Sequence, residues 1–137
     1  MRYLSFYKPG FDNDAPPPNV DFAGMGALIE EMTAAGILIA TDGLQSSRKG
    51  LKVQVDEAGD FVVTDGPFTE TKEVIGGYAI LEARSREHVI ELTKRFLAVM
   101  GSGQCEVRLM ADAASEGCLD GQIAMGEAAE GVLSQGN

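Results

Sequence analysis

The sequence has few of the residues that build metal sites and disulfide frameworks. Its 137 residues include one histidine, His88, and two cysteines, Cys105 and Cys118. These residues lack the spacing of zinc ligands, and His88 is expected on the surface of a helix's first turn. Two cysteines in unlike surroundings do not suggest a secreted, disulfide-bonded protein. We therefore expect no metal, no cofactor and a reducing, cytoplasmic environment.

Basic residues and long apolar runs are also scarce. The chain has 11 basic and 21 acidic residues, which gives a net charge of −10. This charge argues against nucleic acid or an anionic membrane as the main partner. No apolar run approaches the roughly 20 residues of a membrane helix, and the N-terminus does not resemble a signal peptide. The common nucleotide-binding and hydrolase motifs, such as G-x-x-x-x-G-K and G-x-S-x-G, are absent as well.

The length favours one domain followed by a tail of different composition. Residues 111–137 are rich in alanine and glycine, and they carry five acidic residues but no lysine or arginine. The tail thus accounts for −5 of the total of −10, and the other 110 residues carry the remaining −5. We predict a folded domain over residues 1–110 and a peripheral, partly helical tail over residues 111–137.

The apolar residues of the first 110 positions follow two periods. Helical spacing predicts helices over residues 21–35 and 85–100, and alternation predicts strands. The order is strand, helix, strand, inserted hairpin, strand, helix, strand, which is typical of an antiparallel ferredoxin-like α+β sheet with both helices on one face. Because apolar residues such as Ile80 and Leu81 lie on both faces of the strands, we also expect a homodimer. The predicted strands are 2–7, 37–40, 51–55, 61–64, 74–83 and 105–110.

The first candidate site is the loop of residues 65–73, which we call the DGPF loop. Turn chemistry accounts for Asp65, Gly66 and Pro67, but it does not account for the five polar residues that follow Phe68. A carboxylate beside an apolar pocket could have a raised pKa and act as a general acid or base. Alternatively, Asp65 binds only the backbone amides of its own turn.

The second candidate is the loop of residues 43–50, which we call the serine loop. Its hydroxyls, amide and cations suit an anionic ligand, although a solvated connection between strands is the alternative. We predict that the two loops face a common cavity, with Lys72 or Arg48 supplying positive charge. The alternative for Lys72 is a surface pair with Glu70 or Glu73. The candidate ligand-binding residues are Gln45, Arg48, Asp65, Glu70, Thr71, Lys72, Glu73 and Arg108, the last of which could equally pair with Glu106.

These motifs resemble one family. "VTDGPFTETKEVIGGYAILEA" is similar to the signature of the YCII-related proteins of the DGPF type, with support from "DGLQSS" upstream and "CEVRLM" downstream. The resemblance covers residues 1–110 and implies a ferredoxin-like fold whose sheets pair into a dimeric α+β barrel. YCII relatives carry a histidine in the first helix and an aspartate after the second, proposed as a catalytic pair. This sequence has neither, so that chemistry does not carry over.

The resemblance leaves the function open. DGPF proteins also resemble partners of extracytoplasmic-function sigma factors, beside whose genes they are often encoded, which suggests regulation. We expect a protein that binds a small, possibly anionic molecule, or an enzyme of unknown reaction, with its pocket beside the DGPF loop. The alternative is a non-enzymatic regulatory partner of such a sigma factor. In a third interpretation, the signature residues only fix the loop and the dimer.

Overall fold

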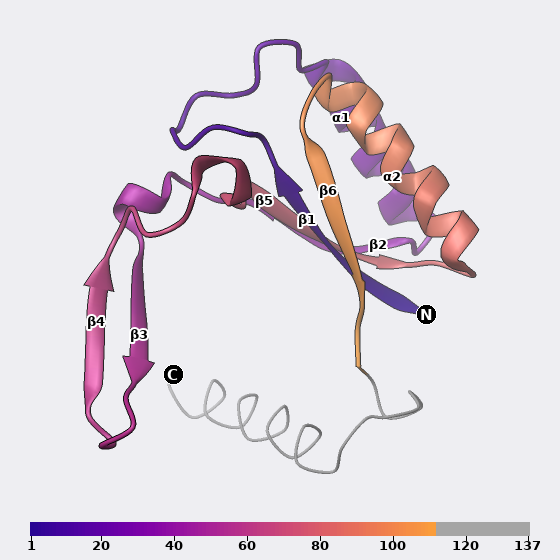
Figure 1. Ribbon diagram of the computed structural model, residues 1–137. Helices are drawn as coiled ribbons and strands as arrows, with labels where there is room; N and C mark the ends of the chain where they lie inside the picture. Colours follow the sequence, from indigo (N-terminus) through magenta and orange to yellow (C-terminus); the bar gives the residue numbers. More distant parts are fainter. Residues whose placement is uncertain (112–137) are drawn as a thin grey trace, which may run out of the picture.

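The computed structural model describes residues 1–111. The predicted acidic tail and Cys118 lie outside these described residues, apart from Ala111. Six strands and two α-helices follow one another along the chain (Figure 1). In chain order they are β1 (Arg2–Lys8), α1 (Phe22–Ala34), β2 (Leu38–Gly43), β3 (Leu51–Val55), β4 (Phe61–Asp65), β5 (Gly77–Glu82), α2 (Arg86–Met100) and β6 (Gln104–Leu109). Two short 3-10 helices, η1 (Ser47–Lys49) and η2 (Thr71–Glu73), lie in the serine loop and the DGPF loop.

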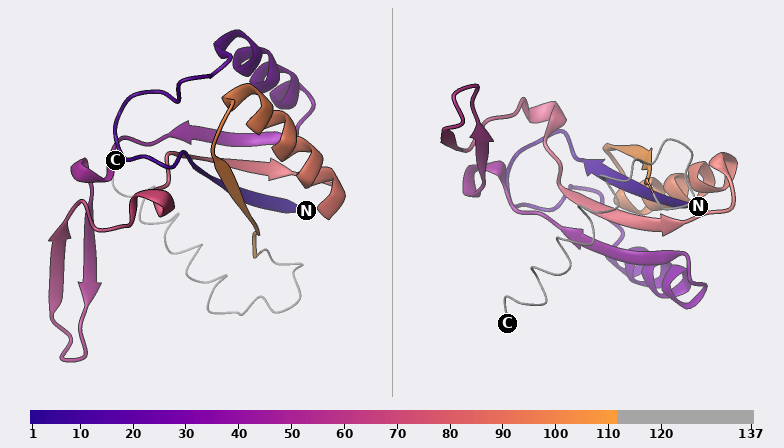
Figure 2. Two further views of the ribbon diagram at one scale, coloured as in Figure 1. Left: turned by 45° about the horizontal axis from the view of Figure 1, so that its top comes forward. Right: turned by 90° about the horizontal axis from the view of Figure 1, so that it is seen from below.

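Four of the strands form one antiparallel sheet in the order β2-β5-β1-β6. The central strand β1 pairs Leu4 with Ile80 on one side and with Arg108 on the other. Both helices cover the same face of this sheet (Figures 1 and 2). The predicted ferredoxin-like α+β class is therefore confirmed.

The helix ends follow from local capping. The carboxylate of Asp21 accepts a hydrogen bond from the Gly24 N–H at 2.9 Å, and the Ser85 hydroxyl accepts one from the His88 N–H at 3.1 Å. Each cap satisfies a backbone donor that the first helical turn leaves free. The second helix ends at Met100, and its C-cap residue Gly101 has a φ of 79°, which suits glycine. Both predicted helices are confirmed to within one residue at each end.

The core lies between the sheet and the helices. Alternation along β1 buries Tyr3, Ser5 and Tyr7 on the helix side, while Leu4 and Phe6 face the other way. Burial of apolar surface at this interface is the main stabilising contribution to the fold. The core cluster consists of Tyr3, Leu28, Met32, Leu81, Ala83, Val89 and Leu92.

Two strands differ from the predicted bounds by more than one residue. The second strand continues to Gly43 rather than ending at Ala40, because Asp42 and Gly43 still pair with β5. The fifth strand begins at Gly77 rather than at residue 74. At Gly77 the backbone of β5 closely approaches that of β2, since a Cβ there would lie 3.0 Å from the Asp42 carbonyl oxygen.

The hairpin of β3 and β4 forms a separate two-stranded sheet. It projects from the motif loops on the side of the main sheet that faces away from the helices (Figures 1 and 2). All ten residues of its strands are exposed. The half-buried sheet residues Leu4, Phe6, Tyr78 and Ile80 face away from the helices, because they alternate with the buried residues of β1 and pair across to β5. Within residues 1–111, no helix is long and apolar enough to cross a membrane.

Candidate functional site

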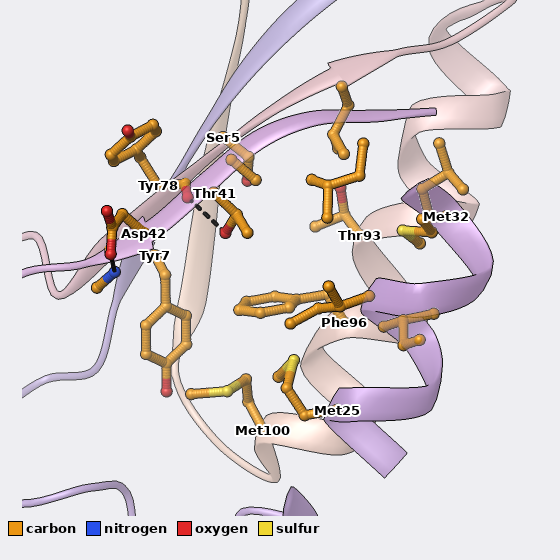
Figure 3. A pocket seen from close by; sticks show the side chains of 18 of the residues that line it. Ser5, Tyr7, Met25, Met32, Thr41, Asp42, Tyr78, Thr93, Phe96 and Met100 are labelled. Carbon is orange, nitrogen blue, oxygen red and sulfur yellow. Dashed lines mark hydrogen bonds between the residues drawn. The ribbon is translucent and has the colours of Figure 1, made fainter. Parts of the chain in front are cut away.

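A cavity of about 440 Å³ lies between the main sheet and the two helices (Figure 3). Its walls come from the helix-facing side of the sheet and from the inner faces of α1 and α2. The side chain of Tyr7 packs edge-on against Phe96, with ring centroids 5.5 Å apart and an interplanar angle of 84°. Met25 and Met100 lie together at one end of the cavity. The apolar lining consists mainly of Met25, Leu28, Ile29, Met32, Leu38, Leu81, Leu92, Phe96 and Met100.

Most polar side chains around this cavity already have partners. The Tyr7 hydroxyl donates to the Ser102 carbonyl oxygen at 2.8 Å, and burial raises the pKa of this phenol. The hydroxyl of Thr41 donates to the Tyr78 carbonyl oxygen at 2.9 Å, and that of Thr93 to Val89 at 2.7 Å. The O–H donors of these groups are therefore occupied within the fold, and the hydroxyl oxygens keep the capacity to accept a hydrogen bond.

One charged side chain lines the cavity among the described residues. Asp42 lies at one end, where its carboxylate accepts the Gly43 N–H at 3.1 Å (Figure 3). The ring of Tyr78 points away from the cavity, so this residue contributes mainly backbone to the wall. In residues 1–111, no group of three histidine, cysteine, aspartate or glutamate side chains is placed to hold a metal ion.

A second, more open recess of about 530 Å³ lies between the serine loop and the DGPF loop. Gln45 and Glu73 both line it, as do Lys49 and Phe68. The two loops predicted to share a cavity do therefore border one recess. It is more polar in composition than the cavity under the helices, and its lining includes Lys49 and Gly50, which directly precede β3.

Two carboxylates from the loop of residues 9–21, called the proline-rich loop because it contains Pro16, Pro17 and Pro18, hold the serine loop in place. Asp12 accepts hydrogen bonds from the Ser47 hydroxyl at 2.5 Å, the Ser47 N–H at 2.8 Å and the Ser46 hydroxyl at 2.9 Å. Asp14 accepts from the Ser46 N–H at 2.7 Å and from the Lys49 ammonium at 2.6 Å. The Ser47 hydroxyl is the main cause of the lowered pKa of Asp12, and Lys49 is the main cause for Asp14.

The DGPF tetrapeptide docks onto the serine loop through its glycine. The Gly66 N–H donates to the Gly50 carbonyl oxygen at 2.9 Å, and the Gly66–Pro67 peptide bond is cis. A Cβ on Gly66 would lie 1.8 Å from the Ser47 carbonyl oxygen, so another residue does not fit without movement. Phe68 then packs below the Lys52 ammonium, which lies 5.0 Å from the ring centroid.

The structure separates the other predicted ligand-binding residues. Arg48, Asp65, Glu70, Thr71 and Lys72 are exposed and do not line the recess or the cavity. The Lys72 ammonium lies 3.6 Å from the Glu70 carboxylate, and both side chains are about three-quarters exposed, at 75% and 76%. Lys72 therefore forms a surface pair with Glu70, which was the alternative to a contact with a ligand.

Arg108 lies on the outer face of β6, away from both pockets. Its guanidinium is 3.4 Å from the Glu106 carboxylate, which is the internal ion pair weighed from the sequence. Register places Arg108 beside Leu4, on the sheet face that the helices do not cover.

Lys8 joins the DGPF loop to the sheet, a role that sequence reasoning missed. Its side chain is only 11% exposed, and its ammonium lies 2.9 Å from Glu106 and 2.9 Å from Glu73. Hydrogen bonds to Glu106, and then to Glu73, raise the pKa of Lys8. The sequence signal was a lysine at the end of a largely apolar strand, and its partners lie 65 and 98 residues away.

Comparison with known proteins supports the family. The model of the YCII-related domain matches residues 12–111. The chain belongs to the YCII-related family. This match does not distinguish the DGPF type within the family.

A search of curated proteins finds no match. Among solved structures, the chain is similar to 5-chloro-2-hydroxyhydroquinone dehydrochlorinase from Burkholderia phenoliruptrix AC1100, in a complex with 2,5-dihydroxybenzoquinone. The sequence identity is 14% and the TM-score is 0.43, over 82% of this chain and 96% of the other. At these values, the similarity says nothing of this chain's activity.

Proposed function

We propose that this YCII-related protein binds a small, largely apolar organic molecule in the cavity between the sheet and the helices. One observation carries the proposal: about 440 Å³ of space is bordered mainly by methionine, leucine and aromatic side chains. Well-packed protein interiors leave few voids larger than a water molecule. Ligand pockets, in contrast, typically measure about 300–1,000 Å³ and have mostly apolar walls.

The charge at the cavity's end narrows the class of ligand. Asp42 is the one charged side chain among the described residues of the lining. An anionic group near it would be repelled, and no lysine or arginine in the lining would compensate. A neutral ligand, or one with a cationic or hydrogen-bond-donating end near Asp42, fits this arrangement best.

The same geometry supports binding more than catalysis. General acid–base catalysis needs a titratable group within hydrogen-bond reach of the reacting proton. In the described lining, the Tyr7 phenol is engaged with Ser102, and Asp42 has no second acid or base beside it. An enzymatic role would rest on Asp42 alone.

An anionic molecule in the recess between the two loops is the alternative. There, Lys49 is the lysine of the lining, but Asp14 already holds its ammonium at 2.6 Å. Glu73 adds a carboxylate to the same lining, so an anion gains little attraction. No contact within residues 1–111 bears on the regulatory role beside a sigma factor that the resemblance suggests.

Fluorescence titration with the neutral apolar probe N-phenyl-1-naphthylamine tests the cavity. We expect saturable binding with one site per chain. Ala79→Leu places three further carbons in the cavity wall and should weaken binding at least tenfold. Ala27→Leu is the matched control, because Ala27 is exposed on α1 and does not line the cavity.

Equal affinity of the two variants for the probe would contradict the cavity proposal. Inorganic phosphate and benzoate test the recess in the same protein. A rise in melting temperature with either anion that Lys49→Ala abolishes, combined with no binding of the neutral probe, would favour the recess instead.

A further inference from the structure

Two serine side chains of the described residues are buried, and they differ in whether their hydroxyls are engaged. Ser46 is 8% exposed, and its hydroxyl donates to the Asp12 carboxylate at 2.9 Å. Ser5, on β1, is 7% exposed and lines the cavity between the sheet and the helices (Figure 3). Its hydroxyl forms no hydrogen bond with a nitrogen or oxygen of residues 1–111. Because buried polar groups in folded proteins nearly always have such a partner, the Ser5 hydroxyl needs an explanation.

The Ser5 oxygen borders the cavity rather than being sealed within the core. In the described part of the chain, every completely enclosed side-chain nitrogen or oxygen has a hydrogen-bond partner, so an oxygen without one must be accessible. Cys105 of β6 lies on the same face of the sheet, opposite Tyr7 in the register. Burial raises the pKa of the Cys105 thiol, and the Ser5 hydroxyl acts in the opposite direction. A thiol is only a weak hydrogen-bond partner, so the Ser5 O–H keeps its capacity to bind a ligand.

The other polar side chains that face the cavity cannot replace Ser5 as donors. Three hydroxyls already donate their protons to carbonyl oxygens of the protein, namely those of Tyr7, Thr41 and Thr93. The ionised Asp42 carboxylate accepts hydrogen bonds and donates none. Among the described residues of the lining, Ser5 therefore supplies the hydroxyl proton that a bound molecule can use.

We propose that Ser5 donates a hydrogen bond to the ligand of this cavity, and that the ligand carries a neutral acceptor such as the carbonyl oxygen of an aromatic ketone. This inference rests on the proposed function of the cavity. A neutral acceptor takes up the Ser5 proton without bringing a charge into a mostly apolar lining that has no lysine or arginine. A carboxylate in the same place would also be repelled by Asp42.

The position of Ser5 in the sheet orients such a ligand. Register places Ser5 opposite Ala79 of β5, and Ala79 opposite Thr41 of β2, and all three residues line the cavity. The small side chain of Ala79 leaves room for a planar ring to lie over it with its carbonyl group at Ser5. Phe96 and the methionine side chains of the two helices face this row of the sheet (Figure 3). An aromatic body gains an offset or edge-on contact with Phe96 there, in addition to burial of its apolar surface.

Fluorescence titration of the full chain with two neutral probes of similar size tests the inference. The probe 6-propionyl-2-(dimethylamino)naphthalene carries a ketone, whereas N-phenyl-1-naphthylamine contains no oxygen. Ser5→Ala should weaken binding of the ketone probe about fivefold or more and shift its emission to shorter wavelength, because the carbonyl loses a hydrogen bond. Binding of N-phenyl-1-naphthylamine should change less than about twofold. Ser102→Ala is the matched control, since it removes the same hydroxyl from an exposed residue outside the lining and should change neither affinity.

The melting temperature without probe separates this role of Ser5 from a structural one. Ser5→Ala should melt no lower than the unmodified chain, because it removes a hydroxyl that the fold does not satisfy. A clearly lower melting temperature, an equal loss of affinity for both probes, or an unchanged affinity for the ketone would each overturn the inference while the cavity proposal stands. Failure of both probes to bind the unmodified chain would overturn the cavity proposal and this inference with it.

Discussion

Single glycines determine how closely the two motif loops approach each other. At Gly66 a Cβ would lie 1.8 Å from the Ser47 carbonyl oxygen, whereas at Gly26, within α1, it would meet nothing within 4 Å. The first position forbids a side chain and the second tolerates one. Close packing against the backbone of the serine loop therefore explains the glycine of the DGPF tetrapeptide, and this explanation needs no role in binding.

Gly66→Ala should therefore destabilise the protein by about 1–3 kcal/mol, because the loops must separate to admit the methyl group. Gly26→Ala is the control, and it should stabilise the protein by up to about 1 kcal/mol through higher helix propensity. Urea unfolding followed by circular dichroism measures both changes. Equal stability of Gly66→Ala and the unmodified protein would show that the loops do not pack as described.

At the residue scale, only contacts between side chains close in sequence could be predicted. The surface pair of Lys72 with Glu70 involves neighbours in sequence, and it was one of the expected alternatives. The contacts of Lys8 with Glu106 and of Asp12 with Ser47 join residues 98 and 35 positions apart. No short-range pattern marks such pairs, because the fold alone brings them together.

At the scale of elements, the helices were predictable because their caps and apolar stripes are local. The cavity was not, because its lining residues have the composition of an ordinary core. Met25, Phe96 and Met100 look like packing residues in the sequence, and only the placement of α1 and α2 on the sheet leaves space among them. The motif loops drew attention instead, and they border a separate recess through Gln45 and Glu73.

The attachment of the serine loop to the proline-rich loop should make stability depend on pH. Hydrogen bonds from Ser47 lower the pKa of Asp12 below its ordinary value of 3.8. The unfolded chain then binds a proton at Asp12 more readily than the folded chain does. The stabilisation by the Asp12 carboxylate is therefore fully present above pH 3.8 and is lost as pH falls through the lower, folded-state pKa. Asp12→Asn should be less stable than the unmodified protein at pH 6, and the difference should shrink toward pH 2.

Urea unfolding at intervals between pH 2 and pH 7 measures this dependence. Glu57→Gln, in the turn of the β3–β4 hairpin, is the control, because the backbone N–H groups of this turn donate to the neighbouring Asp56 carboxylate instead. Its stability should follow that of the unmodified protein at every pH. A constant difference between Asp12→Asn and the unmodified protein over the whole range would contradict a role for the Asp12 charge.

At the scale of the whole molecule, the homodimer expected from the sequence should couple folding to association. Association stabilises the folded state by mass action, so the melting temperature should rise with protein concentration. For two chains of this size, a tenfold increase should raise it by about 2–5 °C. Differential scanning calorimetry at two concentrations decides the matter, and a melting temperature of the unmodified protein that stays constant would count against the dimer.

The hairpin of β3 and β4 joins the rest of the domain through two residues that lie side by side, Gly50 and Gly66. The Gly66 N–H donates to the Gly50 carbonyl oxygen, so the two residues that flank the hairpin are as close as the two ends of a tight turn. Residues 51–65 thus form a separate structural unit, whose two strands pair only with each other within the described residues. A short turn, or a hairpin with another surface, could replace it while the sheet, the helices and the cavity keep their positions, which makes it the natural place for grafting a new binding specificity onto this fold.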